Sequence, residues 1–146
     1  MVEIKKILCA VDFSEASTRV AEYAKTLALT FGAKVVVVYA APSLSQYVGF
    51  HVPPNSIENF VGEIVSGAEK TMDNYLNEAF EGVEVQGKVV TGYAAEEILR
   101  VADEERVDII IMGTHGRRGI DRILFGSVAE KIVKSSKRPV LTIRPV

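Results

Sequence analysis

The sequence VDIIIMGTHGRRGIDRILFGSVA, residues 107–129, contains a strand pattern, a loop and a helix start in direct succession. The first part, residues 107–112, is a continuous apolar run of the kind that forms a fully buried strand. A glycine-rich loop follows, and a helical pattern begins at Ser127. This order predicts a crossover connection in a protein that alternates strands and helices.

The loop carries the spacing Gly-x2-Gly-x9-Gly-Ser, formed by Gly113, Gly116, Gly126 and Ser127. Glycines let backbone N–H groups approach an anion with no Cβ in the way. The start of a helix adds unpaired N–H donors and a partial positive charge. The combination predicts a phosphate site and favours nucleotide binding. The competing interpretation is a βα loop whose glycines serve turn geometry alone.

Two common nucleotide motifs are absent from the chain. The Walker pattern Gly-x4-Gly-Lys-Ser/Thr does not occur, and the first apolar run is followed by Val11-Asp12-Phe13-Ser14 rather than by Gly-x-Gly-x2-Gly. The sequence therefore does not indicate a P-loop nucleotidase or a dinucleotide-binding fingerprint.

Apolar and helical patterns alternate along the whole chain. Continuous apolar runs at 7–11, 35–40, 107–112 and 140–143 are typical of buried strands in a parallel sheet, whereas 83–90 alternates like an edge strand. Helical patterns are expected from a cap at Ser14 to about residue 30, at 57–80, at 93–105 and from Ser127 onward. Residues 41–56, which include three prolines, are left unassigned.

The alternation predicts one α/β domain over residues 1–146, a three-layer sandwich around a five-stranded parallel sheet. Right-handed crossovers lead us to expect the strand order 3-2-1-4-5. The switch point then lies between the first and fourth strands, which end beside Asp12 and Gly113. Ligands bind at such a point, so topology and motif indicate the same place.

Composition narrows the function classes. The chain is 48% hydrophobic and 25% charged with a net charge of −2, which argues against nucleic acid as its partner. From His115 onward, however, the sequence contains eight Lys and Arg residues and only two acidic residues, and this excess of positive charge suits an anionic ligand. No apolar run reaches the roughly 18 residues of a membrane helix, and no signal-peptide pattern is seen. We therefore expect a cytoplasmic protein with no membrane partner, in which Cys9 is a buried small hydrophobe.

Three stretches, 5–14, 113–127 and 136–143, resemble the universal stress protein family, and the resemblance covers essentially all five strands. The family implies an adenine nucleotide α-hydrolase-like fold. The intact glycine spacing resembles that of the ATP-binding branch of the family. The resemblance implies that ATP, or AMP or ADP, binds with Mg²⁺ carried by the phosphates. It also implies a regulatory stress-response role and a homodimer formed through the last strand.

The resemblance also implies a set of nucleotide-binding positions. Asp12 would lie near the ribose, Val11 and Ala40 would line the adenine pocket, and Met112 would lie beneath the nucleotide. The loop and helix start would hold the ribose and phosphates through Gly113, His115, Gly116, Arg117, Arg118, Gly119, Gly126, Ser127, Val128 and Ala129. Ala129 departs from the family, because some ATP-binding relatives carry a hydroxyl there.

The same residues bear on other classes of function. A slow ATPase acting with a partner would need a group that orients the attacking water, and neither His115 nor Asp12 has an evident partner for that work. A nucleotide-independent dimeric interaction module stays open. This chain has no aspartate after the third expected strand, where a receiver domain would need one. It also has no Ser-Gly-Gly after the first strand, where a related ligase or pyrophosphatase would need it. We expect no catalytic residues and no metal site, since His51 and His115 lack ligand spacing.

Overall fold

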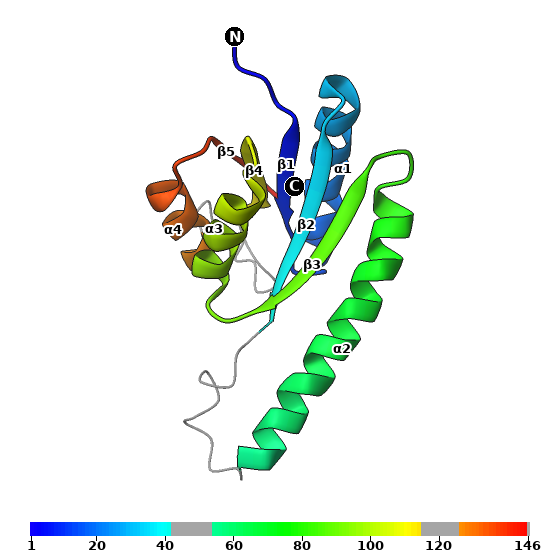
Figure 1. Cartoon of the computed structure of the whole chain (residues 1–146), viewed down its shortest axis with the longest axis vertical. Helices are drawn as coiled ribbons and strands as arrows, with labels where there is room; N and C mark the ends of the chain where they lie inside the picture. Colours follow the sequence, from blue (N-terminus) through cyan, green and yellow to red (C-terminus); the bar gives the residue numbers. More distant parts are fainter. Residues whose placement is uncertain (42–53, 115–125, 146) are drawn as a thin grey trace.

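A computed structural model describes residues 1–41, 54–114 and 126–145, with the backbone alone at 54–58 and 60. Strands and helices alternate through the described ranges (Figure 1). In chain order they are β1 (Lys6–Ala10), α1 (Glu15–Phe31), β2 (Lys34–Ala41), α2 (Pro54–Ala79), β3 (Val85–Thr91), α3 (Ala94–Glu105), β4 (Ile109–Gly113), α4 (Ser127–Ser135) and β5 (Val140–Ile143).

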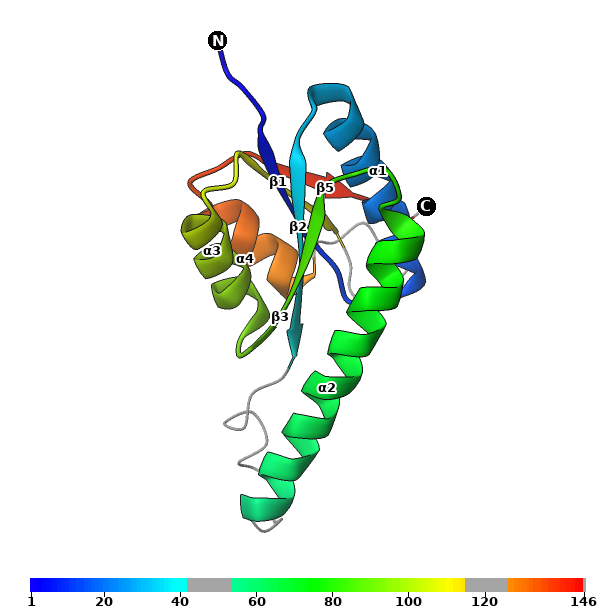
Figure 2. The same cartoon turned by 45° about the vertical axis from the view of Figure 1, so that its right-hand side comes forward.

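The five strands form one parallel sheet with the order β3-β2-β1-β4-β5, which confirms the predicted topology. β1 is central and pairs with two neighbours, so that Ile7 lies opposite Val35 on one side and Ile109 on the other. Helices α1 and α2 cover one face of the sheet, and α3 and α4 cover the other (Figure 2). The predicted three-layer sandwich is confirmed.

The continuous apolar runs are explained by burial on both faces. Along β1, Ile7 and Cys9 pack into the core under α1 and α2, while Leu8 and Ala10 pack into the core under α3 and α4. β2 divides in the same way, with Val35 and Val37 in the first of these cores and Val36 and Val38 in the second. A parallel sheet with helices on both faces requires this pattern.

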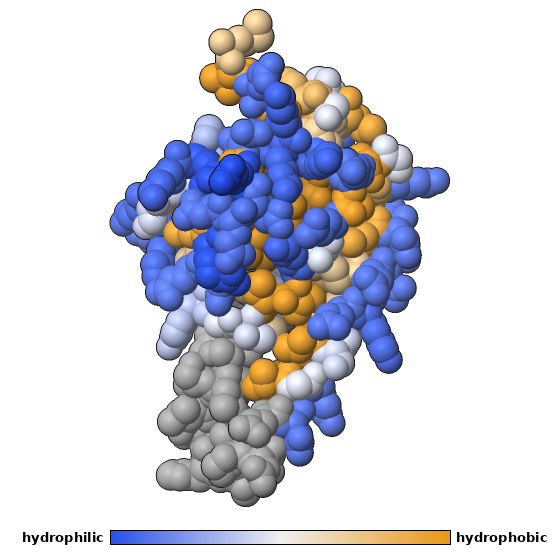
Figure 3. All heavy atoms as spheres, in the orientation of Figure 1, coloured by the Kyte–Doolittle hydropathy of each residue, from blue (hydrophilic) through white to orange (hydrophobic). Residues whose placement is uncertain are grey.

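β3 is an edge strand, as its alternation predicted, and most of its residues are only half-buried. Helix α2 packs closely against it at Gly87, where a Cβ would lie 2.5 Å from Cγ of Met72. The missing side chain therefore lets the helix approach the strand. On the face shown in Figure 3, apolar side chains appear along the line of β3 between mainly hydrophilic surroundings.

Some element boundaries differ from the predicted ones. The fourth strand begins at Ile109 rather than at Val107, and the carboxylate of Asp108, just before it, accepts the backbone N–H groups of Lys5 and Lys6 at 2.8 and 3.0 Å. α2 begins at Pro54, before the predicted residue 57, and proline is well suited to a first helical position. None of the helices in the described ranges has both the length and the apolar character needed to cross a membrane.

Candidate functional site

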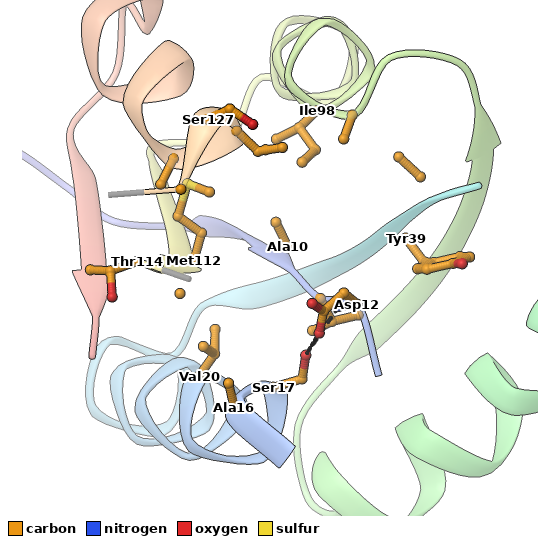
Figure 4. A pocket seen from close by; sticks show the side chains of 17 residues that line it. Ala10, Asp12, Ala16, Ser17, Val20, Tyr39, Ile98, Met112, Thr114 and Ser127 are labelled. Atoms are coloured by element: carbon orange, nitrogen blue, oxygen red, sulfur yellow. Dashed lines mark hydrogen bonds between the residues drawn. The ribbon is translucent and has the colours of Figure 1, made fainter. Parts of the chain in front are cut away.

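A cavity of about 320 Å³ lies at the carboxyl ends of β1 and β4, beside the predicted switch point (Figure 4). Its volume is within the range of about 300–1,000 Å³ that is usual for small-molecule sites. The ends of β1, β2 and β4 and the first turns of α1, α3 and α4 supply its walls. It is the place where the fold leaves room for a ligand.

All nine of the predicted nucleotide-binding residues that the structure describes line this cavity. They are Val11, Asp12, Ala40, Met112, Gly113, Gly126, Ser127, Val128 and Ala129. The remaining predicted residues, His115, Gly116, Arg117, Arg118 and Gly119, lie outside the described residues, as does His51. The structure thus brings together residues from three strand ends and one helix start, and their role in binding stays a prediction.

Eight further residues line the cavity and were not predicted. They are Ala10, Ala16, Ser17, Val20, Tyr39, Ala94, Ile98 and Thr114. Most are small or apolar, and in a sequence such residues look the same as core positions. The sequence positions of Tyr39 and Thr114 could have indicated the cavity, because each directly adjoins a predicted residue at the end of a strand.

Helix α4 starts at the cavity wall and directs its N-terminus there. Its first intrahelical bond runs from the N–H of Glu130 to the carbonyl of Gly126, at 3.0 Å. The N–H groups of Ser127, Val128 and Ala129 precede that bond and have no partner within the helix. Gly126, the N-cap residue, has no side chain to satisfy them, and its own N–H donates to Thr114 at 2.7 Å. The arrangement provides donors for an anion.

Ala129 contributes its backbone rather than its side chain. The residue is only 2% exposed and belongs to the core that includes Ile98 and Met112. Alanine has no hydroxyl to offer at this position, and the group that remains for a ligand is the N–H in the first turn of α4.

β2 runs past the end of β1 and leaves its backbone facing the cavity. The N–H of Val11 donates to the carbonyl of Val38 at 3.0 Å, and beyond this bond the β1 chain turns away. In a parallel sheet, alternate residues direct N–H and C=O to the same neighbour. Ala40 therefore directs both groups to the β1 side of the strand, beyond the last residue of β1 that pairs there, and no described residue bonds to them. Ala40 thus offers one donor and one acceptor side by side.

Asp12 lies in a tight turn after β1 that its own carboxylate holds together. Oδ1 of Asp12 accepts the Ser14 N–H at 3.0 Å, the Ser14 hydroxyl at 2.5 Å and the Ser17 hydroxyl at 2.9 Å. Ser14 occupies the N-cap position of α1, but its side chain makes no capping bond. The predicted cap position is therefore right but the predicted side-chain bond is not formed, and the Ser14 hydroxyl donates to Asp12 instead.

Phe13, the next residue of this turn, has a φ of 62°, in the left-handed region that costs a non-glycine residue about 1–2 kcal/mol. Its ring packs against Tyr39 with centroids 4.7 Å apart and against Tyr75 with centroids 5.6 Å apart. These contacts hold the strained turn in place.

Burial keeps two described titratable groups close to the Asp12 turn, Cys9 and Tyr75, in their neutral forms. Burial raises the pKa of the Cys9 thiol to about 12, so the thiol stays neutral. Burial, with smaller contributions from Cys9 and Asp12, also raises the pKa of Tyr75. Within the described ranges, no group of three or more His, Cys, Asp or Glu side chains is placed to hold a metal ion.

The sheet order, the crossovers and the cavity define a domain with the adenine nucleotide α-hydrolase-like fold. The sequence profile of the universal stress protein family matches residues 3–144, and the chain belongs to that family.

Three relatives illustrate the likeness. Universal stress protein MJ0577 of Methanocaldococcus jannaschii is 32% identical, with 98% of this chain and 96% of that protein covered. Its solved structure superposes with a TM-score of 0.82 over 98% of this chain and 97% of that one. A universal stress protein from Archaeoglobus fulgidus in complex with dAMP is 25% identical, with a TM-score of 0.70 and coverage of 98% and 99%. UspA from Lactobacillus plantarum, 19% identical with coverage of 99% and 100%, shares the fold with a TM-score of 0.84.

Proposed function

We propose that this chain is a single-domain, ATP-binding universal stress protein whose nucleotide occupancy regulates a stress-response dimer. The observation that carries the proposal is the convergence of nine predicted residues on one cavity at the switch point of the sheet. The relative from Archaeoglobus fulgidus, which was crystallised in complex with dAMP, supports a nucleotide of the adenine class.

The adenine would lie against the ends of β1 and β2. Adenine presents an acceptor nitrogen beside an exocyclic amino donor, and the paired N–H and C=O of Ala40 complement these two groups. Val11 and Ile98 supply apolar walls for the ring. This subsite would recognise adenine through backbone hydrogen bonds, so it needs no polar side chain.

The phosphates would lie at the start of α4. The N–H groups of Ser127, Val128 and Ala129 and the hydroxyl of Ser127 supply donors, and Gly126 allows close approach. Asp12 would take the ribose, with Gly113 and residues 115–119 around it, as the family resemblance implies. Mg²⁺ would neutralise phosphate charge and arrive with the nucleotide, with Asp12 as an outer ligand.

The dimer would form through β5, the edge strand opposite β3. β5 pairs with β4 on one side only, and Val140, Leu141 and Thr142 are half-buried. An edge strand with apolar residues is a template for pairing with a second copy.

The test of the proposed function is whether the untreated protein carries a nucleotide. Mass spectrometry of the protein after denaturation should release ATP, ADP or AMP in near-stoichiometric amount. A protein that is free of nucleotide and fails to take up ATP from solution would overturn the proposal.

A further inference from the structure

A polar contact connects helix α2 to the first turn of α1, which borders the cavity. The phenol of Tyr75 on α2 donates to the carbonyl of Ser17, in the first turn of α1, at 2.8 Å. Burial raises the pKa of Tyr75, so the phenol keeps the proton that it donates. A residue of α2 thereby fixes the turn of α1 that borders the cavity.

Ser17 in turn bonds both the backbone N–H and the carboxylate of Asp12. The side chain of Ser17 is buried, at 3% exposure for the residue, and its hydroxyl does two things at once (Figure 4). It accepts the backbone N–H of Asp12 at 3.0 Å and donates to Oδ1 of the same residue at 2.9 Å. Ser14 also donates to Oδ1 of Asp12, but the Ser17 hydroxyl bonds both the carboxylate and the backbone N–H of Asp12 and so helps to fix one relative to the other.

The aromatic contacts reinforce the same connection. Phe13 lies between Tyr75 on α2 and Tyr39 on the cavity wall, and its left-handed backbone is the hinge of the Asp12 turn. Tyr75 therefore supports the turn twice, once through its hydroxyl and once through its ring. The two contributions can be separated experimentally, because Tyr75→Phe removes only the hydroxyl.

We propose that Ser17 and Tyr75 are positioning residues for the ribose subsite, holding the Asp12 carboxylate in the orientation that accepts the ribose hydroxyls of a bound nucleotide. The proposal rests on the proposed function. Helix α2, which contributes no residue to the cavity wall in the described ranges, would then determine how strongly the site selects a hydroxylated ribose.

The experiment compares two nucleotides that differ only at the ribose. Calorimetry with ATP and with 2′,3′-dideoxy-ATP is carried out on the parent protein, on Ser17→Ala and on Tyr75→Phe. The parent should prefer ATP by about tenfold, the value of one hydrogen bond to a charged group. Ser17→Ala should lose most of that preference through weaker ATP binding, while the dideoxy nucleotide binds within about twofold of its parent affinity.

Tyr75→Phe should produce a smaller loss, about threefold, because it acts through Ser17 and keeps its ring contacts. Tyr23→Phe is the matched control, since Tyr23 is an exposed tyrosine of α1 and does not line the cavity. It should leave both affinities unchanged. These variants therefore separate a ribose-specific effect from a general effect on the fold.

Each other outcome has a definite meaning. Equal losses for the two nucleotides in Ser17→Ala would show that Ser17 acts through folding and would overturn the positioning role. So would unchanged affinities in both variants. A parent that binds both nucleotides equally would show that Asp12 does not read the ribose, with nucleotide binding intact. A parent that binds neither would overturn the proposed function together with this inference.

Discussion

Ser127 and Gly126 lie where phosphate oxygens would meet the start of α4. Ser127→Ala should weaken ATP binding by about 1.5–3 kcal/mol, or roughly tenfold to a hundredfold, because it removes a hydroxyl from a charged acceptor. Adenosine, which lacks phosphates, should lose much less. Calorimetry with the two ligands measures the difference.

Ser135→Ala, at the other end of the same helix, is the matched control and should leave ATP affinity unchanged. Gly126→Val should resemble Ser127→Ala, because its side chain would crowd the backbone approach to the anion. Equal losses for ATP and adenosine in Ser127→Ala would show that the serine acts through stability rather than through the phosphates.

At the level of single residues, the sequence revealed the positions with distinctive chemistry. Asp12, Gly126 and Ser127 were predictable, because Asp12 adjoins the expected switch point of the sheet and the other two belong to the Gly-x2-Gly-x9-Gly-Ser spacing. Ser17 was not, because a serine within a helix has no pattern that directs it toward a cavity, and Tyr39 was indicated only by its place beside Ala40. Their involvement depends on the turn of the chain at Phe13, which only the structure shows.

Glu105 shows how the elements are tied together at the end of α3. Its carboxylate contacts Lys6 of β1 at 2.5 Å and Lys88 of β3 at 2.7 Å, with its side chain 16% exposed. Hydrogen bonds from these two lysines lower the pKa of Glu105 to about 2. These two ion pairs therefore link the central strand of the sheet to its edge strand through the side chain of Glu105.

Glu105→Gln should lower the free energy of unfolding at pH 7 by about 1 kcal/mol, a modest value because the lysines are partly exposed. The pKa of Glu105 is lower in the folded chain than its unfolded value of about 4.3. Its stabilisation is therefore present above that value and lost as pH falls toward about 2. Urea unfolding of parent and variant should converge between about pH 5 and pH 2.

Glu78→Gln is the control for this measurement, since Glu78 is an exposed residue of α2. It should show no comparable pH-dependent difference from the parent. A stability gap for Glu105→Gln that stayed constant through the acid range would mean that the ion pairs are not its source.

Element types and their order were predictable because apolar periodicity reflects burial directly. The edge position of β3 followed from its alternation, and burial on both faces of β1 and β2 followed from their continuous runs. Element ends were harder to predict. Asp108 fell within the predicted strand, but β4 begins one residue later, and the carboxylate of Asp108 bonds the backbone of Lys5 and Lys6.

At the scale of the whole molecule, the free edge of β5 predicts the assembly. The parent protein should sediment as a dimer at micromolar concentration, and Leu141→Pro should shift it toward monomer by removing a backbone donor and distorting the edge. Circular dichroism of the variant must show that the fold survives. A parent protein that sediments as a monomer would contradict dimerisation through this strand.

The molecule should also turn over ATP slowly. Neither the described residues of the cavity wall nor the sequence provides an evident base for orienting the attacking water. We expect a rate well below the typical enzyme median of about 10 per second, measured by phosphate release from the purified protein. Turnover at that median, abolished by His115→Ala with ATP binding intact, would place the protein among the enzymes.

The central claim is that the cavity between the ends of β1 and β4 binds an adenine nucleotide, and thermal unfolding with added ligand tests it most directly. ATP with Mg²⁺ at about 100 times its dissociation constant should stabilise the folded chain by roughly 2.7 kcal/mol and raise its Tm. At the same ATP concentration the stabilisation should fall to about 0.4–1.4 kcal/mol in Gly126→Val, whose side chain would crowd the start of α4. A Tm that millimolar ATP and Mg²⁺ leave unmoved in the parent protein would contradict the account.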